Sequence, residues 1–266
     1  MTSAAILHGK NELMRSNIDP TLNVPPAENK PHRGWWLCLL FLALLPGCAA
    51  PGVRVKDTTR TFDTVVIDAG HGGHDDGAKS RWAGREKNHT LSVAQKLQPK
   101  LASAGFRTVM TRSSDVFIEL NDRARISNRQ KNAIFVSVHF NDSPRRKISG
   151  TEVYYKSSVS RPIAQRILSK VSAVRGCHAR FVKTANFRVL RLNEYPAVLV
   201  ECGYLSHRGE GSMCASGTHH ERLAQAIASA IVEQRGPLKG AAAAAPAPQN
   251  PEAAPSPAAA AKKKKS

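Results

Sequence analysis

Three strands that the sequence predicts to be buried each lead into a residue that can bind a metal ion or transfer a proton. The apolar runs 64–67, 133–138 and 197–200 are followed by His71, His139 and Glu201, respectively. In an open α/β sheet the functional crevice lies beyond the carboxyl ends of the strands. Parallel pairing would therefore bring the three side chains to one edge. A single histidine at a strand end is usually structural, but packing hardly explains three such residues at one edge.

Glu86 is a fourth candidate, and the glycine-rich loop 72–78 before it can fold back over the strand ends. Two neutral imidazoles and one carboxylate form a hydrolytic zinc set with an open fourth position. Zinc acidifies water and polarises a carbonyl, and the remaining carboxylate, Glu201, then suits a general base. Taken alone, Glu86 is explained equally well as an acid that the dipole of a helix N-terminus stabilises.

The elements that must position these residues alternate between strand and helix. Further strands are predicted at 107–111 and, at the edge of the sheet, at 151–156. Helices are predicted at 88–104, which Gly105 stops, and at 120–131, 162–174 and 221–233. This alternation predicts an α/β fold: a mostly parallel, twisted sheet flanked by helices on both faces. We expect one catalytic domain at 61–235, after a linker at 48–60.

Four motifs of this domain resemble those of the zinc-dependent N-acetylmuramoyl-L-alanine amidases, the amidase type 3 family. In chain order they are Asp68-Ala69-Gly70-His71-Gly72-Gly73, Gly84-x-Glu86-Lys87, Ser137-Val138-His139-x-Asn141 and Val200-Glu201-x-Gly203-Tyr204-Leu205-Ser206. Weaker matches include Arg112, Arg123 and the segment 183–190, so the resemblance covers roughly residues 64–232.

The resemblance implies hydrolysis of the amide that joins the lactyl group of N-acetylmuramic acid to L-alanine in peptidoglycan. It implies that His71, Glu86 and His139 bind Zn²⁺ and that Glu201 is the catalytic carboxylate. In that mechanism a zinc-activated water attacks the lactyl carbonyl, while Glu201 takes its proton and passes it to the leaving nitrogen.

Two departures from the family pattern stand out. Cys202 occupies a position where the family usually carries an aliphatic residue. Family members that wait for an activating partner carry an extra helical insertion between the second histidine and the catalytic glutamate, whereas one helix is predicted between His139 and Glu201 here. We therefore predict an open zinc site that needs no activating partner, in a protein that is a monomer.

Several polar residues near the motifs allow two interpretations each. His74 and Asp142 are possible replacements for a ligand, and His219 and His220 resemble a metal pair but fall where a solvated helix start is expected. Asn141 either orients a ligand or contacts the substrate. Asp68 either accepts a hydrogen bond from an imidazole or caps the turn. The basic residues Arg145, Arg146 and Lys147 either contact the acidic stem peptide or form a solvated loop.

The chain is strongly basic, with 39 Lys and Arg residues against 20 Asp and Glu and a net charge of +19. This charge favours anionic partners, but only 6% of the residues are aromatic, and no base-stacking or recognition-helix motif is present. We therefore expect no specific nucleic-acid binding. The segment 236–266 is rich in Ala, Pro and Lys and should be disordered. It is either a solvated tail or an electrostatic contact to an anionic envelope polymer.

The beginning of the chain predicts export. An apolar run at 35–45 follows a basic residue and is too short for a membrane span, which needs about 20 residues; the alternative is a buried core helix. Residues 45–49 resemble a bacterial lipoprotein processing box. Under that reading, residues 1–47 are a leader and signal peptide, and lipidated Cys48 anchors the protein to a membrane. Ala49 is compatible with outer-membrane sorting in a two-membrane bacterium, with the domain facing the periplasm.

The cysteines do not define a disulfide framework. The chain has five, of which Cys38 falls in the cleaved leader and Cys48 is lipidated. Cys202 lies in an apolar strand and is expected to be a buried thiol. Pairing of Cys177 with Cys214 stays open.

Two function classes compete with a zinc amidase. One is a catalytically inactive lipoprotein of the same fold that binds peptidoglycan, and the other is a basic nucleic-acid-binding protein. All four chemical positions carry competent groups, which favours the enzyme over the binding module.

Overall fold

The computed structural model describes residues 53–236, which belong to one compact unit. The apolar run 35–45, Cys38, Cys48 and the lysine-rich tail lie outside the described residues, so the statements about them stay predictions. Within 53–236, no helix combines the length and the apolar character needed to cross a bilayer.

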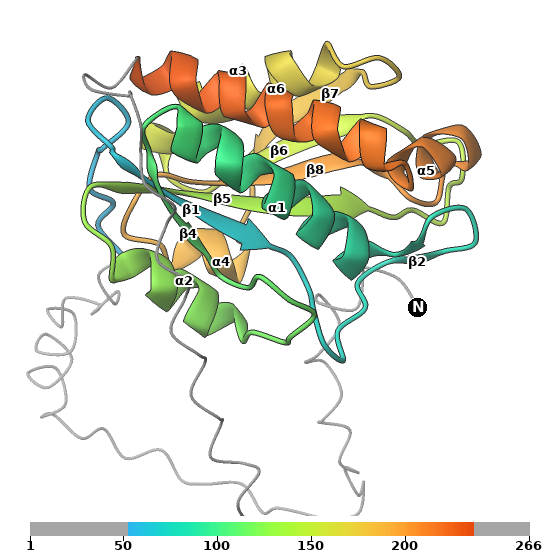
Figure 1. Ribbon diagram of the computed structural model, residues 1–266, viewed down its shortest axis with the longest axis horizontal. Helices are drawn as coiled ribbons and strands as arrows, with labels where there is room; N and C mark the ends of the chain where they lie inside the picture. The colour runs from blue at the N-terminus through green and yellow to red at the C-terminus, as the bar shows by residue number, and fades with distance from the viewer. Residues whose placement is uncertain (1–52, 237–266) are drawn as a thin grey trace, which may run out of the picture. The chain divides into compact units, whose positions relative to one another are not determined.

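A six-stranded sheet forms the centre of the molecule (Figure 1), with the strand order β4-β1-β5-β8-β6-β7. Four neighbours run parallel: β4 (Arg107–Met110), β1 (Thr64–Ala69), β5 (Ala133–Asn141) and β8 (Ala197–Tyr204). The other two strands, β6 (Thr151–Tyr155) and β7 (Ala179–Thr184), are parallel to each other, but β6 is antiparallel to β8. The carboxyl ends of β1, β5 and β8 therefore share one edge.

Helices cover both faces of this sheet (Figure 1). One face carries α1 (Glu86–Ser103), α3 (Arg161–Ser172) and α6 (Gly217–Arg235), and the other carries α2 (Leu120–Asn128) and α4 (Arg188–Arg191). The remaining elements are α5 (Arg208–Cys214), a 3₁₀ turn, η3 (Ser158–Ser160), and a hairpin of β2 (Lys79–Ser80) and β3 (Gly84–Arg85). This arrangement confirms the predicted α/β fold.

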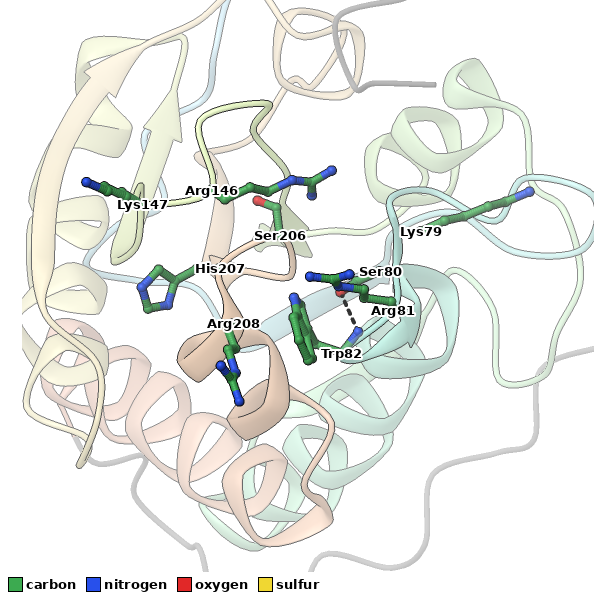
Figure 2. Close-up of a pocket in the computed structure, with 9 residues that line it drawn as sticks. All are labelled: Lys79, Ser80, Arg81, Trp82, Arg146, Lys147, Ser206, His207 and Arg208. Carbon is green, nitrogen blue, oxygen red and sulfur yellow. Dashed lines mark hydrogen bonds between the residues drawn. The ribbon is translucent and has the colours of Figure 1, made fainter.

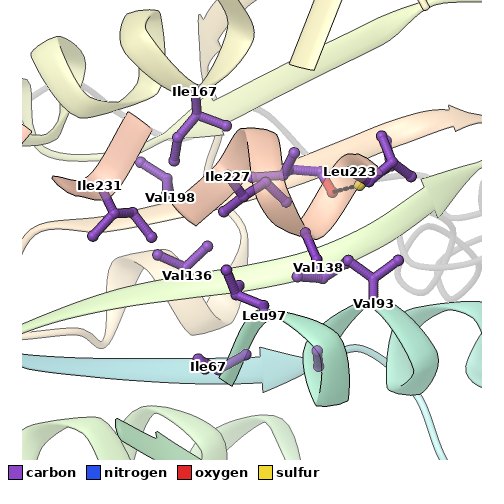
Figure 3. Close-up of a cluster of buried hydrophobic side chains, with 14 of the residues drawn as sticks. Ile67, Val93, Leu97, Val136, Val138, Ile167, Val198, Leu223, Ile227 and Ile231 are labelled. Atoms are coloured by element: carbon purple, nitrogen blue, oxygen red, sulfur yellow. Dashed lines mark hydrogen bonds between the residues drawn. The ribbon is translucent and has the colours of Figure 1, made fainter. Parts of the chain in front are cut away.

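The larger apolar core lies between the sheet and α1, α3 and α6 (Figure 3). Leu97 of α1 and Ile227 of α6 pack in this cluster with Val136 and Val198 of the sheet, and none of the four has exposed surface. Phe135, the neighbour of Val136 on β5, belongs to the smaller cluster on the opposite face. Because both of its faces are buried, β5 reads as a continuous apolar run. Each fully buried side chain of this kind stabilises the fold by roughly 1.5–3 kcal/mol.

The predicted position of one strand is wrong. Residues 151–156 were expected at the edge of the sheet, but β6 lies inside it, between β8 and β7. The edge position is taken by β7, which was not predicted because its sequence, ARFVKT, has no apolar run. The hairpin β2–β3, α4 and α5 were also not predicted. Between His139 and Glu201 the structure has the expected helix, α3, and in addition η3 and the four-residue α4.

His219 and His220 are buried near the start of α6, so the expectation of a solvated helix start is wrong. His220 Nε2 donates to the carbonyl of Cys214 at 2.6 Å, and Nδ1 lies 2.9 Å from Ser92 Oγ. These partners satisfy both ring nitrogens of His220 inside the protein. The two histidines therefore help to pack α6 against its neighbours.

The three cysteines of the described residues are free thiols. Cys202 is buried, as predicted, and the pairing of Cys177 with Cys214 is not formed. Cys177 Sγ lies 3.9 Å from His219 Nε2. Burial raises the pKa of the Cys177 thiol to about 12, so this thiol is protonated at neutral pH and is a weak nucleophile.

The buried His220 predicts a loss of stability in mild acid. Burial, with the positive charges nearby, lowers the pKa of His220 from 6.5 to about 4. Between these values the unfolded chain binds one proton more than the folded chain, so the free energy of unfolding falls as the pH drops from about 6.5 to about 4. We expect His220→Gln to show a flatter pH dependence in this window, measured by urea unfolding. His74→Gln, at an exposed histidine, is the control, and equal slopes in both variants would contradict the prediction.

Candidate metal centre

Three side chains converge beyond the ends of β1 and β5. Glu86 Oε2 lies 3.0 Å from His71 Nε2, and Glu86 Oε1 lies 3.0 Å from His139 Nδ1. The two imidazole rings meet edge to face with their centroids 4.8 Å apart. One possible ligand atom from each residue lies within 4.8 Å of the other two. The structure thus brings together the three residues that were predicted as metal ligands.

Glu86 reaches the cluster as the first residue of α1, which begins two residues earlier than predicted. Its carboxylate is buried and accepts hydrogen bonds from the backbone N–H groups of Ala78 (2.8 Å) and Phe140 (2.9 Å). Burial by itself would raise the pKa of this carboxyl, but the hydrogen bonds with His139 and His71 outweigh burial and hold the pKa below its ordinary value. Both readings of Glu86 therefore apply, because it is a first-turn acid and a member of the cluster.

Two glycines give the cluster the room it needs. A Cβ on Gly70 would lie 2.4 Å from the ring of His139, and a Cβ on Gly77 would lie 2.5 Å from Glu86 Oε2 and 2.7 Å from His71 Cδ2. Gly77 also has a φ of 64°, where glycine alone avoids steric cost. His71 itself has a φ of 62°, a strain of order 1–3 kcal/mol that often marks functional sites.

Asp75, which was not predicted as a site residue from the sequence, orients the first histidine. His71 Nδ1 lies 2.8 Å from Asp75 Oδ2, so Nδ1 donates to the carboxylate and Nε2 faces Glu86. Burial opposes protonation of His71, but the hydrogen bonds with Asp75 and Glu86 outweigh it and raise the pKa to about 10. The two carboxylates thus favour a cation between them. Carboxylate partners of this kind commonly fix the ring of a metal-binding histidine.

Two buried arginines hold the backbone from which His71 projects. Arg112 and Arg123 are 1% and 2% exposed. Their guanidinium groups donate hydrogen bonds to backbone carbonyls. At 2.7–2.9 Å they donate to four carbonyls around the loop, those of Ala69, Gly70, His71 and Lys87. The backbone around His71 is therefore fixed by side chains of the protein itself.

Asp68 has neither of the two roles predicted for it. Its Oδ1 accepts from Arg123 Nη1 at 2.8 Å and from Thr111 Oγ1 at 2.6 Å, and its Oδ2 accepts from Ser137 Oγ at 2.6 Å. Burial would raise the pKa of Asp68, but the Arg123 guanidinium and the two hydroxyl groups keep it below its ordinary value. Asp68 is thus the buried counter-ion that holds Arg123 in place.

Glu201 lies on β8, where its register partners are His139 on β5 and Glu152 on β6. Its Oε2 atom is buried and has no hydrogen-bond partner within residues 53–236. Burial raises the pKa of Glu201, and the negative charges of Glu86 and Glu152 raise it further. A buried carboxyl group with a free oxygen is suited to take up and release a proton.

Glu152, which was not predicted as a site residue from the sequence, accepts hydrogen bonds from four side chains. Its Oε1 accepts from Arg180 Nε and Tyr204 Oη, both at 2.6 Å, and its Oε2 accepts from Tyr154 Oη at 2.7 Å and Asn141 Nδ2 at 3.1 Å. The sequence signal was a carboxylate inside an apolar strand pattern. These contacts make Asn141 an orienting partner of Glu152, and they place a fixed negative charge beside Glu201.

The other polar candidates lie outside the cluster. The His74 ring packs against Phe117 with centroids 4.0 Å apart, and Asp142 pairs with Arg146 at 3.6 Å. Neither is among the three residues that come together as possible ligands in the described part of the chain. Arg145, Arg146 and Lys147 are exposed in the loop after β5.

The donor set fits zinc. Zn²⁺ is bound by imidazole nitrogens and carboxylate oxygens, and three protein ligands are typical of its catalytic sites. Ca²⁺ and Mg²⁺ prefer sets of oxygen ligands, which His71 and His139 do not provide. A buried carboxylate flanked by two imidazoles, with a second buried carboxyl group on the neighbouring strand, is a set of groups suited to hydrolysis.

Comparison with known proteins links the chain to one family of hydrolases. The sequence profile of the family described as N-acetylmuramoyl-L-alanine amidase matches residues 65–233. The N-acetylmuramoyl-L-alanine amidase LytC of Bacillus subtilis is 32% identical over 169 residues, which is 62% of this chain but 34% of LytC. The matched part therefore spans about a third of that relative.

Solved structures of amidases share the fold. The catalytic domain of CwlV, an N-acetylmuramoyl-L-alanine amidase from Bacillus (Paenibacillus) polymyxa var. colistinus, is 37% identical with a TM-score of 0.62, covering 65% of this chain and 97% of that domain. The N-acetylmuramoyl-L-alanine amidase AmiC2 of Nostoc punctiforme is 35% identical with a TM-score of 0.61, covering 64% and 95%, respectively.

Proposed function

Because this chain belongs to the N-acetylmuramoyl-L-alanine amidase family, we propose that it hydrolyses the amide bond between N-acetylmuramic acid and L-alanine in peptidoglycan. The observation that carries the proposal is the meeting of His71, Glu86 and His139, with possible ligand atoms within 4.8 Å of one another. Glu201 supports it, because its strand neighbour in the sheet is His139.

His71, Glu86 and His139 would hold a zinc ion. When bound, zinc polarises a carbonyl group as a Lewis acid and lowers the pKa of water. Asp75 keeps Nδ1 of His71 protonated, so that Nε2 is the nitrogen that faces the centre. Glu86 accepts hydrogen bonds from two backbone N–H groups. Burial would raise its pKa, but its hydrogen bonds with the two histidines hold the pKa below its ordinary value, which suits a carboxylate ligand.

Glu201 would act as the general base and then as the general acid. Its carboxylate takes a proton from the attacking water and gives it to the alanine nitrogen as the C–N bond breaks. What supports this role is the unpaired Oε2 atom and a pKa that burial and the neighbouring carboxylates raise. Glu152, fixed by its four hydrogen-bond donors, would place a negative charge beside Glu201.

The setting of the enzyme is proposed from the sequence outside residues 53–236. We propose export and a lipid anchor at Cys48, with the catalytic domain facing the periplasm and the outer membrane as the anchoring membrane in a two-membrane bacterium. The boundaries 1–47, 48–60, 61–235 and 236–266 belong to the same proposal, as does a contact of the lysine tail with anionic envelope polymers. The enzyme is proposed to be a monomer that needs no activating partner.

Digestion of purified sacculi tests the proposed activity. We expect the purified protein to release stem peptides that begin with alanine, and a chelator to stop the release until zinc is restored. Mass analysis of the soluble products provides the measurement. Fragments cut within the glycan strands would contradict an amidase, and unaltered sacculi would favour the inactive binding module.

A further inference from the structure

A cationic hollow that has no part in the mechanism described so far is lined by segments that lie close in sequence to His71, Glu86, His139 and Glu201. Its volume is about 590 Å³, and five of its lining side chains are basic: Lys79, Arg81, Arg146, Lys147 and Arg208. Figure 2 shows Arg146 and Ser206 across the hollow from the segment Ser80, Arg81 and Trp82. A volume of this size is in the range of sites for small ligands, about 300–1,000 Å³.

The hollow is built from the three chain segments that leave the metal centre. Lys79 to Trp82 lie between His71 and Glu86 in sequence, Arg146 and Lys147 follow His139, and Ser206 to Arg208 follow Glu201. Buried or half-buried hydrogen bonds tie these segments together. Ser80 Oγ donates to the carbonyl of Leu205 at 2.5 Å, and Ser143 N donates to Ser206 Oγ at 2.9 Å.

Trp82 holds two of the guanidinium groups in place. The Arg81 guanidinium carbon lies 4.3 Å from the centroid of the indole ring, and that of Arg208 lies 5.4 Å from it. The backbone N–H of Trp82 donates to Ser80 Oγ at 3.1 Å, and a Cβ added to Gly211 would lie 3.3 Å from the Cβ of Trp82, so the base of this side chain is closely packed. Arginines held on an aromatic face lose less freedom when they bind a carboxylate.

The positive charge of the hollow is only partly neutralised. Lys79 pairs with Asp76 at 3.0 Å, and Arg146 pairs with Asp142 at 3.6 Å. None of the ion pairs within residues 53–236 involves Arg81, Lys147 or Arg208. A second hollow of about 540 Å³ shares Arg146 and Lys147 and adds further basic side chains. Such a site favours an anionic ligand.

The sequence separation from Glu201 limits how far from it the hollow can lie. Ser206 lies five residues beyond Glu201, so the chain between them spans at most about 18 Å. A stem peptide of a few residues, attached at the scissile amide, reaches as far when it is extended. Its free carboxylates would then lie among the guanidinium groups.

We propose that the cationic hollow is the subsite for the free carboxylates of the stem peptide, and that it makes the enzyme selective for stems whose carboxylates are not amidated. This inference rests on the proposed function. Arg146 and Arg208 are the specificity residues, because they approach the hollow from different segments. Arg81 and Trp82 form its preorganised wall.

Binding of a product peptide tests the proposal without turnover. Trp82 is one of three tryptophans, and the others are Trp35 and Trp36. In the full chain with Trp35→Phe and Trp36→Phe, Trp82 fluorescence should change on titration with a stem peptide that begins with L-alanine and has two free carboxylates. The same peptide with both carboxylates amidated should bind at least about tenfold more weakly, since charge-assisted hydrogen bonds are lost.

Charge-matched variants assign the effect to the hollow. Arg146→Gln with Arg208→Gln should weaken binding of the acidic peptide by about tenfold or more and remove the preference over the amidated peptide. Arg129→Gln with Arg222→Gln, which removes the same charge from exposed residues outside the hollow, should leave both affinities unchanged. Arg146→Gln alone, at an exposed loop residue, repeats the test if the double variant does not fold.

Hydrolysis separates this inference from the proposed function. On zinc-loaded protein, the Arg146→Gln, Arg208→Gln pair should raise KM for acidic stems by about tenfold and change kcat by less than about twofold. Equal binding of acidic and amidated peptides, or a change in Trp82 fluorescence with polyphosphate but not with the peptide, overturns the proposal. Selective peptide binding by a protein that leaves sacculi intact overturns the amidase function and supports the carboxylate site.

Discussion

Glu201→Gln is expected to retain the metal ion and the fold while kcat on sacculi falls by about 10²–10⁴-fold, the usual contribution of a general acid–base group. The amide of glutamine cannot take a proton from water, but it has the shape of the carboxyl it replaces. The Oε2 atom of Glu201 also accepts no hydrogen bond within the described residues. The substitution therefore removes proton transfer with little loss of packing.

The measurement combines turnover with metal analysis. Released stem peptides give kcat, metal content by mass spectrometry gives occupancy, and thermal unfolding gives stability. Glu194→Gln is the matched control, because Glu194 is a partly exposed carboxylate whose side chain pairs with Lys56 at 3.0 Å. Near-normal turnover in Glu201→Gln would mean that another group moves the proton. Loss of the metal ion would instead make Glu201 a ligand.

His139→Ala is expected to abolish stoichiometric zinc binding and to reduce activity by more than the loss of Glu201 does. Removal of this imidazole leaves His71 and Glu86 as the two remaining members of the cluster, and a catalytic zinc site normally has three protein ligands. The substitution also leaves Glu86 Oε1 without the partner at 3.0 Å. Both the metal ion and the Lewis-acid chemistry that depends on it are lost.

Zinc titration and peptide release measure this second effect. His74→Ala is the control, since His74 is an exposed histidine of the neighbouring loop that packs on Phe117 outside the cluster. It should bind zinc and turn over like the unaltered protein. Full zinc occupancy in His139→Ala, or loss of occupancy in His74→Ala, would show that the ligand set is different.

The ends of the interior strands could be predicted from the sequence because continuous apolar runs indicate such strands. The runs that lead to His71, His139 and Glu201 are apolar on both faces, which identifies interior strands of a parallel sheet. Parallel strands place their carboxyl ends at one edge, so the approach of His71 to His139 followed from the fold class alone. The place of Glu86 in the cluster was predicted with the help of the family resemblance, because the loop before it only allows such a position.

Other features depend on contacts that a local pattern does not contain. Glu152 and Arg180 lie on the strands β6 and β7, whose reversed direction relative to β8 was not visible in their composition. His219 and His220 look polar, yet His220 finds partners in Ser92 and the Cys214 carbonyl, which lie on other elements. Whether a polar residue is solvated or satisfied inside the protein depends on these distant partners.

The two buried arginines behind His71 also bear on how strongly folding depends on a bound metal ion. Arg112 and Arg123 donate hydrogen bonds to the carbonyls of Ala69, Gly70 and His71. In small zinc domains the ion itself drives folding, whereas here side chains of a larger domain also hold the backbone around His71. We therefore expect removal of a metal ion from the proposed site to lower activity far more than it lowers the free energy of unfolding.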